Sequence, residues 1–162
     1  MEACIGLVLV SHGAWLRSRN AMELLRSKQC ERILYMGDVE TQEVLDALAG
    51  NCVSMVFGNC DNVSRLHDYA ITLGLDVQHP AGVVTVDEKR IAFLHGDDDL
   101  KFHSFLDDES IDVIVHGHSH EKRDEVVNNT RCINPGALHR APVYTVAVLD
   151  TEDDTLTFYE LD

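Results

Sequence analysis

Residues 111–120 read IDVIVHGHSH, an apolar run that ends in a glycine and two closely spaced histidines. The run from Ile111 to Val115 predicts a buried strand, which would place the histidines at the edge of a sheet. Because His118 and His120 are two residues apart, both imidazoles can face one centre in an extended or turning segment. Paired imidazoles are typical metal ligands, and a pair of solvated histidines is the alternative interpretation.

The same pattern, an apolar run followed by glycine and polar residues, recurs along the chain. Because the ends of neighbouring strands meet at one edge of an α/β sheet, we expect these polar side chains to converge there. Together they offer carboxylate, amide and imidazole groups, which suit Mn, Fe, Zn or Ni better than Ca or Mg. The stretches are Ser11-His12-Gly13, Gly37-Asp38, Gly58-Asn59-Cys60-Asp61, His95-Gly96-Asp97, Gly117-His118-Ser119-His120 and Asn134-Pro135-Gly136.

The order of apolar and polar segments predicts alternating strands and helices first and antiparallel hairpins later. The continuous apolar strands are typical of strands buried on both faces. The expected fold class is α/β, a β-sandwich of mixed sheets flanked by helices, in one domain over residues 1–162. Helices are expected over 14–27, 41–49, 63–73 and up to 105, and strands over 5–10, 32–36, 52–57, 83–86, 90–94, 111–115, 125–127, 131–133, 143–149 and 156–161.

The composition limits the classes of function. The 162 residues are 45% hydrophobic and carry a formal net charge of -15, which is typical of a globular acidic protein and unlike a binder of nucleic-acid backbones. We expect no membrane span and no signal peptide, and therefore a cytoplasmic protein. The scattered cysteines lack C-x-x-C spacing, which argues against a disulfide framework and a cysteine zinc site; they are Cys4, Cys30, Cys52, Cys60 and Cys132.

The ordered series of motifs resembles the calcineurin-like metallophosphoesterase superfamily, and within it the small bacterial and archaeal phosphodiesterases. Residues 58–61 (GNCD) are similar to that branch's G-N-C-D, residues 117–120 (GHSH) to the superfamily's G-H-x-H, and residues 133–136 (INPG) to the branch's I-N-P-G. The resemblance covers nearly the whole chain. It implies a four-layer αββα fold and the hydrolysis of phosphodiester-containing small molecules.

The resemblance also implies two divalent metal ions, with manganese expected and iron, zinc or nickel as alternatives. In such sites the ions lie about 3.5–4 Å apart, a hydroxide that they hold attacks phosphorus in line, and their charge stabilises the phosphoryl oxygens. Carried over onto this chain, Asp38 would bridge the ions, Asn59, His95 and His118 would complete one shell, and His12 and His120 would serve the other.

Two positions depart from the family pattern. The family's first motif is Asp-x-His, whereas this chain has Val10-Ser11-His12. Because valine cannot coordinate an ion, we expect the first site to be weakened, partly occupied, and filled when substrate phosphate supplies oxygens. Larger relatives carry a histidine at Cys60 as a candidate general acid. The small phosphodiesterases also have cysteine there, which favours activated diesters as substrates.

Several site residues have a second interpretation. Asp38 could cap a helix, and Asn59 could form a turn. Asp61 could orient neighbouring site residues or cap the next helix. Arg140 could contact a substrate phosphate or be solvated. His12 could be the remnant of a decayed motif.

Three functions are therefore compatible with the sequence. The first is a metal-dependent phosphodiesterase, with activity reduced by Val10. The second is a catalytically inactive scaffold that uses the same fold to bind other proteins, and the third is a mononuclear metal-binding protein without turnover. Retention of Asp38, Asn59, His95 and His118 favours the first function, and Val10 favours the second.

Overall fold

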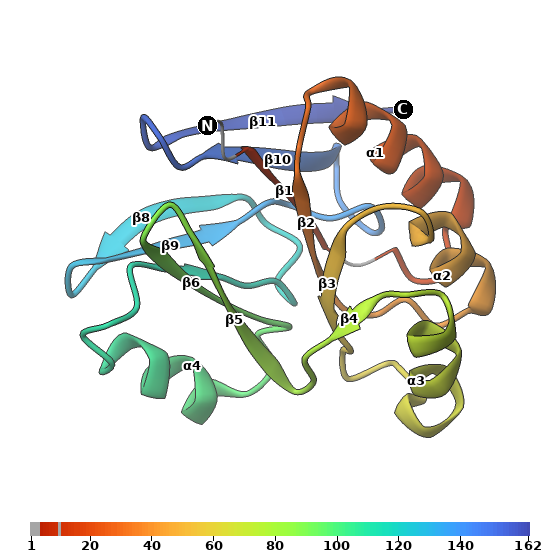
Figure 1. The fold of residues 1–162 in the computed structure, drawn as a ribbon, viewed down its shortest axis with the longest axis horizontal. Coiled ribbons are helices and arrows are strands. Elements are labelled where there is room, and N and C mark those ends of the chain that lie inside the picture. Colours follow the sequence, from red (N-terminus) through yellow and green to blue (C-terminus); the bar gives the residue numbers. More distant parts are fainter. Residues whose placement is uncertain (1–3, 10) are drawn as a thin grey trace.

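The computed structural model describes residues 4–9 and 11–162, and its strands form two sheets that face each other (Figure 1). The larger sheet has the strand order β11-β10-β1-β2-β3-β4. Strands β1 to β4 pair in parallel, whereas β10 pairs antiparallel with both β1 and β11. Its strands are β1 (Cys4–Val8), β2 (Arg32–Met36), β3 (Val53–Val56), β4 (Asp76–Val77), β10 (Tyr144–Asp150) and β11 (Thr155–Leu161).

The smaller sheet has the order β5-β6-β7-β9-β8. Its centre is parallel, because β7 pairs in parallel with both β6 and β9, and each edge is closed by an antiparallel partner. Its strands are β5 (Ala81–Val86), β6 (Lys89–Leu94), β7 (Val113–Val115), β8 (Arg123–Val127) and β9 (Thr130–Asn134).

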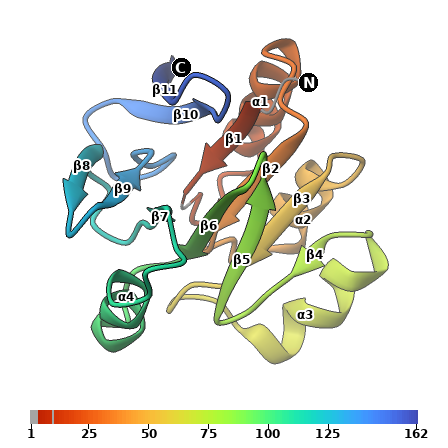
Figure 2. The ribbon, with the colours of Figure 1, turned by 60° about the vertical axis from the view of Figure 1, so that its left-hand side comes forward.

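Helices cover the outer faces of both sheets and complete four layers (Figures 1 and 2). The larger sheet is covered by α1 (Trp15–Ser27), α2 (Gln42–Leu48) and α3 (Val63–Thr72), and the smaller sheet by α4 (Asp99–Leu106). Three of these helices begin at a polar side chain that accepts a hydrogen bond from the helix backbone; these caps are Thr41, Asn62 and Asp98.

The central core lies between the two sheets and explains the continuous apolar strands of the sequence. Leu7 and Leu34 from the larger sheet pack against Phe93 and Val115 from the smaller one, and all four are fully buried. A second cluster lies between the larger sheet and helices α1 to α3. Strands such as β2 are thus buried on both faces, as parallel strands in α/β folds are.

The expected fold class, a mixed-sheet sandwich flanked by helices, is confirmed. Strand β2 has the expected bounds, and the expected helices are observed with ends shifted by at most one residue. Strand β4 (Asp76–Val77) was not expected, because two residues carry too little of an alternating pattern. Within the described residues, no helix is long and apolar enough to cross a membrane.

Candidate metal centre

Polar side chains from both sheets meet at one edge of the sandwich, beyond the carboxyl ends of its parallel strands. His12 follows β1, Asp38 follows β2, and Asn59 follows β3 in the larger sheet. His95 follows β6 and His118 follows β7 in the smaller sheet. Backbone hydrogen bonds tie these loops together within each sheet, from the His12 amide to the Asp38 carbonyl (2.9 Å) and from the Gly117 amide to the His95 carbonyl (2.9 Å).

His95 is the most firmly held member of the cluster. Its side chain is buried, and Nδ1 donates to the backbone carbonyl of Met36 on the opposite sheet at 2.7 Å. Nε2 lies 2.9 Å from Asn59 Oδ1, 3.2 Å from Asp38 Oδ2 and 3.3 Å from His118 Nδ1. A histidine whose Nδ1 is tied to a carbonyl presents Nε2 as its ligand atom, which is the usual arrangement around bound metals.

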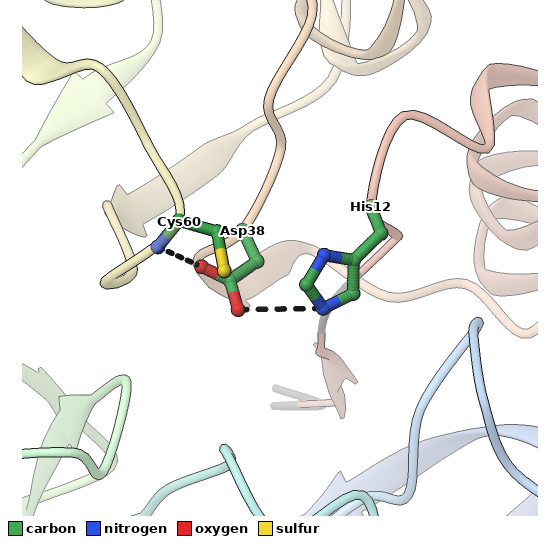
Figure 3. A group of neighbouring side chains, drawn as sticks. All are labelled: His12, Asp38 and Cys60. Atoms are coloured by element: carbon green, nitrogen blue, oxygen red, sulfur yellow. Dashed lines mark hydrogen bonds and ion pairs between the residues drawn. The ribbon is translucent and has the colours of Figure 1, made fainter.

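Asp38 lies between the imidazoles of His95 and His12. Its Oδ1 accepts the Cys60 amide at 2.9 Å, and its Oδ2 lies 3.2 Å from His95 Nε2 and 3.5 Å from His12 Nε2 (Figure 3). Burial by itself raises the pKa of Asp38. The hydrogen bonds from His95 and the Cys60 amide, with the nearby imidazoles, outweigh burial and lower that pKa. Asp38 is therefore a carboxylate that faces two imidazoles.

His12 is held from the other side of its ring. Nδ1 lies 2.6 Å from Glu40 Oε2, and the side chain is 15% exposed. The His120 ring lies 5.7 Å from the His12 ring between centroids, and the His139 ring lies 4.9 Å away. His12 and His120 are thus neighbours. No side chain of this group is as deeply buried as His95.

Cys60 contributes a thiol to the same place, which the sequence did not predict as a ligand. Ligand atoms of His12, Asp38 and Cys60 all lie within 4.8 Å of one another (Figure 3). Cys60 is an exposed residue of this group. Partial desolvation and the negative charges of Asp38 and Glu40 raise the pKa of the Cys60 thiol.

The backbone at the cluster adopts conformations that residues other than glycine rarely take. His12, Asp38, His118 and His120 have φ angles of 44°, 55°, 73° and 61°. Such left-handed residues are strained and persist only where the surrounding structure fixes them, which is common at functional sites. Close approach also requires glycine at position 58, because a Cβ there would lie 2.2 Å from Asp38 Oδ1.

Asp61 joins two of the loops that carry the cluster. Its carboxylate accepts the Gly58 amide at 2.9 Å and the Glu40 amide at 2.7 Å. Burial raises the pKa of Asp61 despite these hydrogen bonds. Helix α3 is capped by Asn62, so the interpretation of Asp61 as the helix cap is wrong.

Arg140 and His116 differ in their relation to the cluster. Arg140 is exposed with φ of 49° and directly follows His139, whose ring lies 4.9 Å from the His12 ring, so it lies near the cluster. His116 lies outside the group of ligand atoms. Its Nε2 is 3.1 Å from Arg123 Nη1 and its ring packs on Phe102. Helix α2 is capped by Thr41, so Asp38 is not a helix cap.

A cavity of about 270 Å³ opens beside Asn59 and His95. Apolar walls come from Phe57, Val63, Pro80 and Leu94, and charged groups from Asp97, Asp98 and Lys101. His79 lines this cavity and accepts the Phe57 amide on Nδ1 at 3.2 Å. The only hint in the sequence was its place before Pro80, where the βα pattern ends.

The donor set fits divalent transition metals. His95 and His12 each have one ring nitrogen occupied by a protein acceptor and the other directed to Asp38. Carboxylate and amide oxygens complete a mixed nitrogen and oxygen set. The convergence of these groups supports a metal centre. Val10, where the family has an aspartate, lies outside the described residues.

Known proteins share both the sequence pattern and the fold. The family model for the calcineurin-like phosphoesterase superfamily domain matches residues 4–154. Phosphodiesterase MJ0936 of Methanocaldococcus jannaschii is 23% identical over 154 residues, which cover 91% of this chain and 93% of that protein. The structure of an archaeal phosphodiesterase has a TM-score of 0.89 at 22% identity, over 98% of this chain and 99% of that one. Vps29 of Entamoeba histolytica, complexed with zinc, has a TM-score of 0.63 at 16% identity over 98% of each chain.

Proposed function

This chain belongs to the calcineurin-like phosphoesterase superfamily, and on that premise we propose that it hydrolyses small phosphodiesters with two divalent metal ions. The placement of the Asp38 carboxylate between the imidazoles of His95 and His12 carries this proposal. The similarity to phosphodiesterase MJ0936 over most of both chains supports a diester as the substrate.

The proposed ligands divide between two ions that share Asp38. Asn59, His95 and His118 would hold one ion. Asn59 Oδ1 and His118 Nδ1 lie 2.9 and 3.3 Å from His95 Nε2, which supports a single centre. His12 and His120 would hold the other ion. When bound, the two ions would lower the pKa of a water molecule and neutralise charge on the phosphoryl oxygens.

Manganese is the proposed metal, with iron, zinc and nickel as alternatives, because imidazole combined with carboxylate and amide oxygen suits these ions. Vps29 of Entamoeba histolytica, a structural neighbour, is described in complex with zinc. Since Val10 contributes no carboxylate, the ion at His12 is proposed to be the weaker one.

The protein's own groups would orient the substrate around this centre. The cavity beside Asn59 and His95 has apolar walls, which suit one ester arm of the diester. Arg140, exposed near Cys60, is placed to approach a phosphate, and Asp61 holds the loops of Gly58 and Glu40 in position. The Cys60 thiol has a raised pKa and is a weak proton donor, which favours diesters with a good leaving group.

A scaffold without catalytic activity is the second candidate, and Val10 is the observation that favours it. The missing carboxylate is a change expected where hydrolysis is no longer selected. The firmly held His95 and Asp38 favour the enzyme instead, because a protein-binding surface has no need for a buried imidazole beside a carboxylate.

The two candidates are separated by one set of measurements. The chain is purified with manganese, its metal content is measured by mass spectrometry, and hydrolysis of bis(4-nitrophenyl) phosphate is followed by the absorbance of the nitrophenolate product. The enzyme predicts turnover that increases in Val10→Asp and disappears in His118→Ala. Absence of turnover in both the parent and Val10→Asp would exclude the enzyme, and turnover that survives His118→Ala would exclude this site.

A further inference from the structure

Glu40 makes the shortest polar contact of the His12 side chain, although it lies on a different loop from His12. Its Oε2 lies 2.6 Å from His12 Nδ1, while His12 Nε2 lies 3.5 Å from Asp38 Oδ2. The His12 ring therefore stands between two carboxylates. Because an imidazole offers one nitrogen to an ion, a ring held through Nδ1 presents Nε2 on the side of Asp38.

The backbone of Glu40 is fixed from both ends. Its amide donates to Asp61 Oδ1 at 2.7 Å, and its carbonyl accepts Arg65 Nη2 at 2.8 Å. It also has a φ of 63°, which is unfavourable for a residue with a side chain. Helix α3 supplies Arg65, and the loop before it supplies Asp61. The position of the Glu40 carboxylate is thus built into the loops of the site.

We propose that Glu40 is a positioning residue that takes over the electrostatic role of the carboxylate missing at position 10. It would do so through His12, by fixing the ring with Nε2 free and by adding a negative charge next to the weaker ion. Carboxylates hydrogen-bonded to a histidine ligand have this effect on bound metals in general. The inference rests on the proposed metal sites and makes the weaker site dependent on Glu40.

A series of variants of the full chain tests this proposal through manganese binding, measured by calorimetry on protein freed of metal with a chelator. Glu40→Gln removes the charge, and Glu40→Ala also removes the contact with His12. We expect the weaker ion to lose about 10-fold affinity in the first and about 100-fold in the second, the range for partners of histidine ligands. The stronger ion at His95 should keep its affinity. Glu43→Ala is the matched control, because it removes an exposed acid on helix α2.

Two further measurements separate positioning from a general structural effect. In the double variant Val10→Asp/Glu40→Ala, the weaker ion should regain its affinity, because the family's carboxylate is restored. Nitrogen-15 spectra of His12 in metal-free protein should show a proton on Nδ1 in the parent and a mixture of tautomers in Glu40→Ala. Circular dichroism verifies that each variant is folded. Should Glu40→Ala unfold, Glu40→Asp is used instead. It keeps the charge but withdraws the carboxylate from His12, and is expected to lower the affinity for the same ion.

Three outcomes would overturn the proposal. They are a parent that binds a single ion, a Glu40→Ala protein with the manganese affinities of Glu43→Ala, and a double variant in which aspartate at position 10 restores nothing. Failure of the proposed function gives a different result. In that case the parent binds two ions, with the weaker one dependent on Glu40, but hydrolyses no activated diester.

Discussion

The two sides of the histidine cluster are held in different ways. On the His95 side, the side chain is 1% exposed, and a backbone carbonyl on the opposite sheet fixes its tautomer. On the His12 side, the imidazole is 15% exposed and a glutamate side chain, itself 36% exposed, takes the place of that carbonyl. One side is thus defined by the packing of two sheets, and the other by the contact between two side chains.

This difference shows which part of the site depends on the fold and which part depends on individual residues. A carbonyl at the end of strand β2 cannot be lost by a substitution, so Nε2 of His95 stays directed at Asp38 as long as the sheets pack. The orientation of His12 is instead open to change at Glu40. The chain lacks the family's aspartate on this more adjustable side.

Asp38 is common to both sides, and its substitution should have the largest effect. Asp38→Asn keeps the shape of the side chain but removes the charge that faces both imidazoles. We expect both ions to be lost and hydrolysis to fall by about 10³-fold, because the electrostatic stabilisation of the reaction is removed. Metal content and the rate with bis(4-nitrophenyl) phosphate measure this. Retention of one tightly bound ion would mean that the two sides do not share Asp38.

Substitution of the two histidines should then separate the sides. His95→Gln removes the firmly held proposed ligand and leaves the Met36 carbonyl without its donor, so we expect a loss of rate of about 10²–10³-fold. His12→Gln removes a proposed ligand of the weaker ion, and a loss of rate of about 10–100-fold is expected. Metal counting should show one remaining ion in each variant. Equal losses of rate in the two variants would contradict the difference between the His95 side and the His12 side of the cluster.

Substitution of Gly58 tests whether close packing keeps the Asp38 carboxylate between the two sides of the histidine cluster. In Gly58→Ala, the new Cβ would lie 2.2 Å from Asp38 Oδ1, so the carboxylate must move. We expect destabilisation of about 1–3 kcal/mol and weaker binding of both ions. Gly50→Ala is the control. Its φ of 80° predicts strain of roughly 1–2 kcal/mol, but nothing lies within 4 Å of the new Cβ. Manganese affinity that falls equally in both variants would exclude the displacement of Asp38 as the cause.

The sequence predicted the side that the fold defines better than the side that depends on individual contacts. Strand β2 and the residues after it were predictable, because a continuous apolar run must be buried and its end must turn at glycine. The short strand β4 has no comparable signal. The Glu40 contact was not predictable, because nothing in Asp38-Val39-Glu40 indicates that the last side chain crosses to a ring 28 positions earlier in the chain.

The cavity beside His95 illustrates the same limit. Phe57 and Asn59 follow strand β3, whereas Lys101 belongs to helix α4, and only the packing of the two sheets brings them together. The stretch Gly58-Asn59-Cys60-Asp61 was expected at this edge, but the spacing of the cysteines gave no indication that the Cys60 thiol would lie among the metal-ligating atoms. Local sequence patterns therefore predict which residues end at the edge of the sandwich, but not which ones contact each other across it.

The smallest effect is expected for a charge pair outside the cluster. Its substitution shows how much such a pair contributes to the free energy of unfolding without a metal ion. Asp124 and Arg131, on the β8–β9 hairpin, form two hydrogen bonds of 2.8 and 2.9 Å. The hydrogen bond from Arg131, opposed by partial burial, lowers the pKa of Asp124. The carboxylate is 36% exposed, so we expect Asp124→Asn to cost only about 0.5 kcal/mol at pH 7.

The pH dependence of this cost follows from the direction of the pKa shift. Because the pKa of Asp124 is lower in the folded protein than the usual value of about 3.9 in unfolded chains, the pair stabilises the protein fully above that value. Its contribution disappears as the pH falls through the folded pKa, when the carboxylate is protonated. Urea unfolding of Asp124→Asn, the parent and the exposed control Glu152→Gln across the acid range measures this. A loss of free energy of unfolding that persisted in acid would contradict the ion pair as its cause. If Asp124→Asn instead lost more free energy of unfolding at neutral pH than metal-free Glu40→Ala, ordinary pairing would be stronger here than at His12. The value of Glu40 would then lie in placing a ligand and not in the stability of the fold.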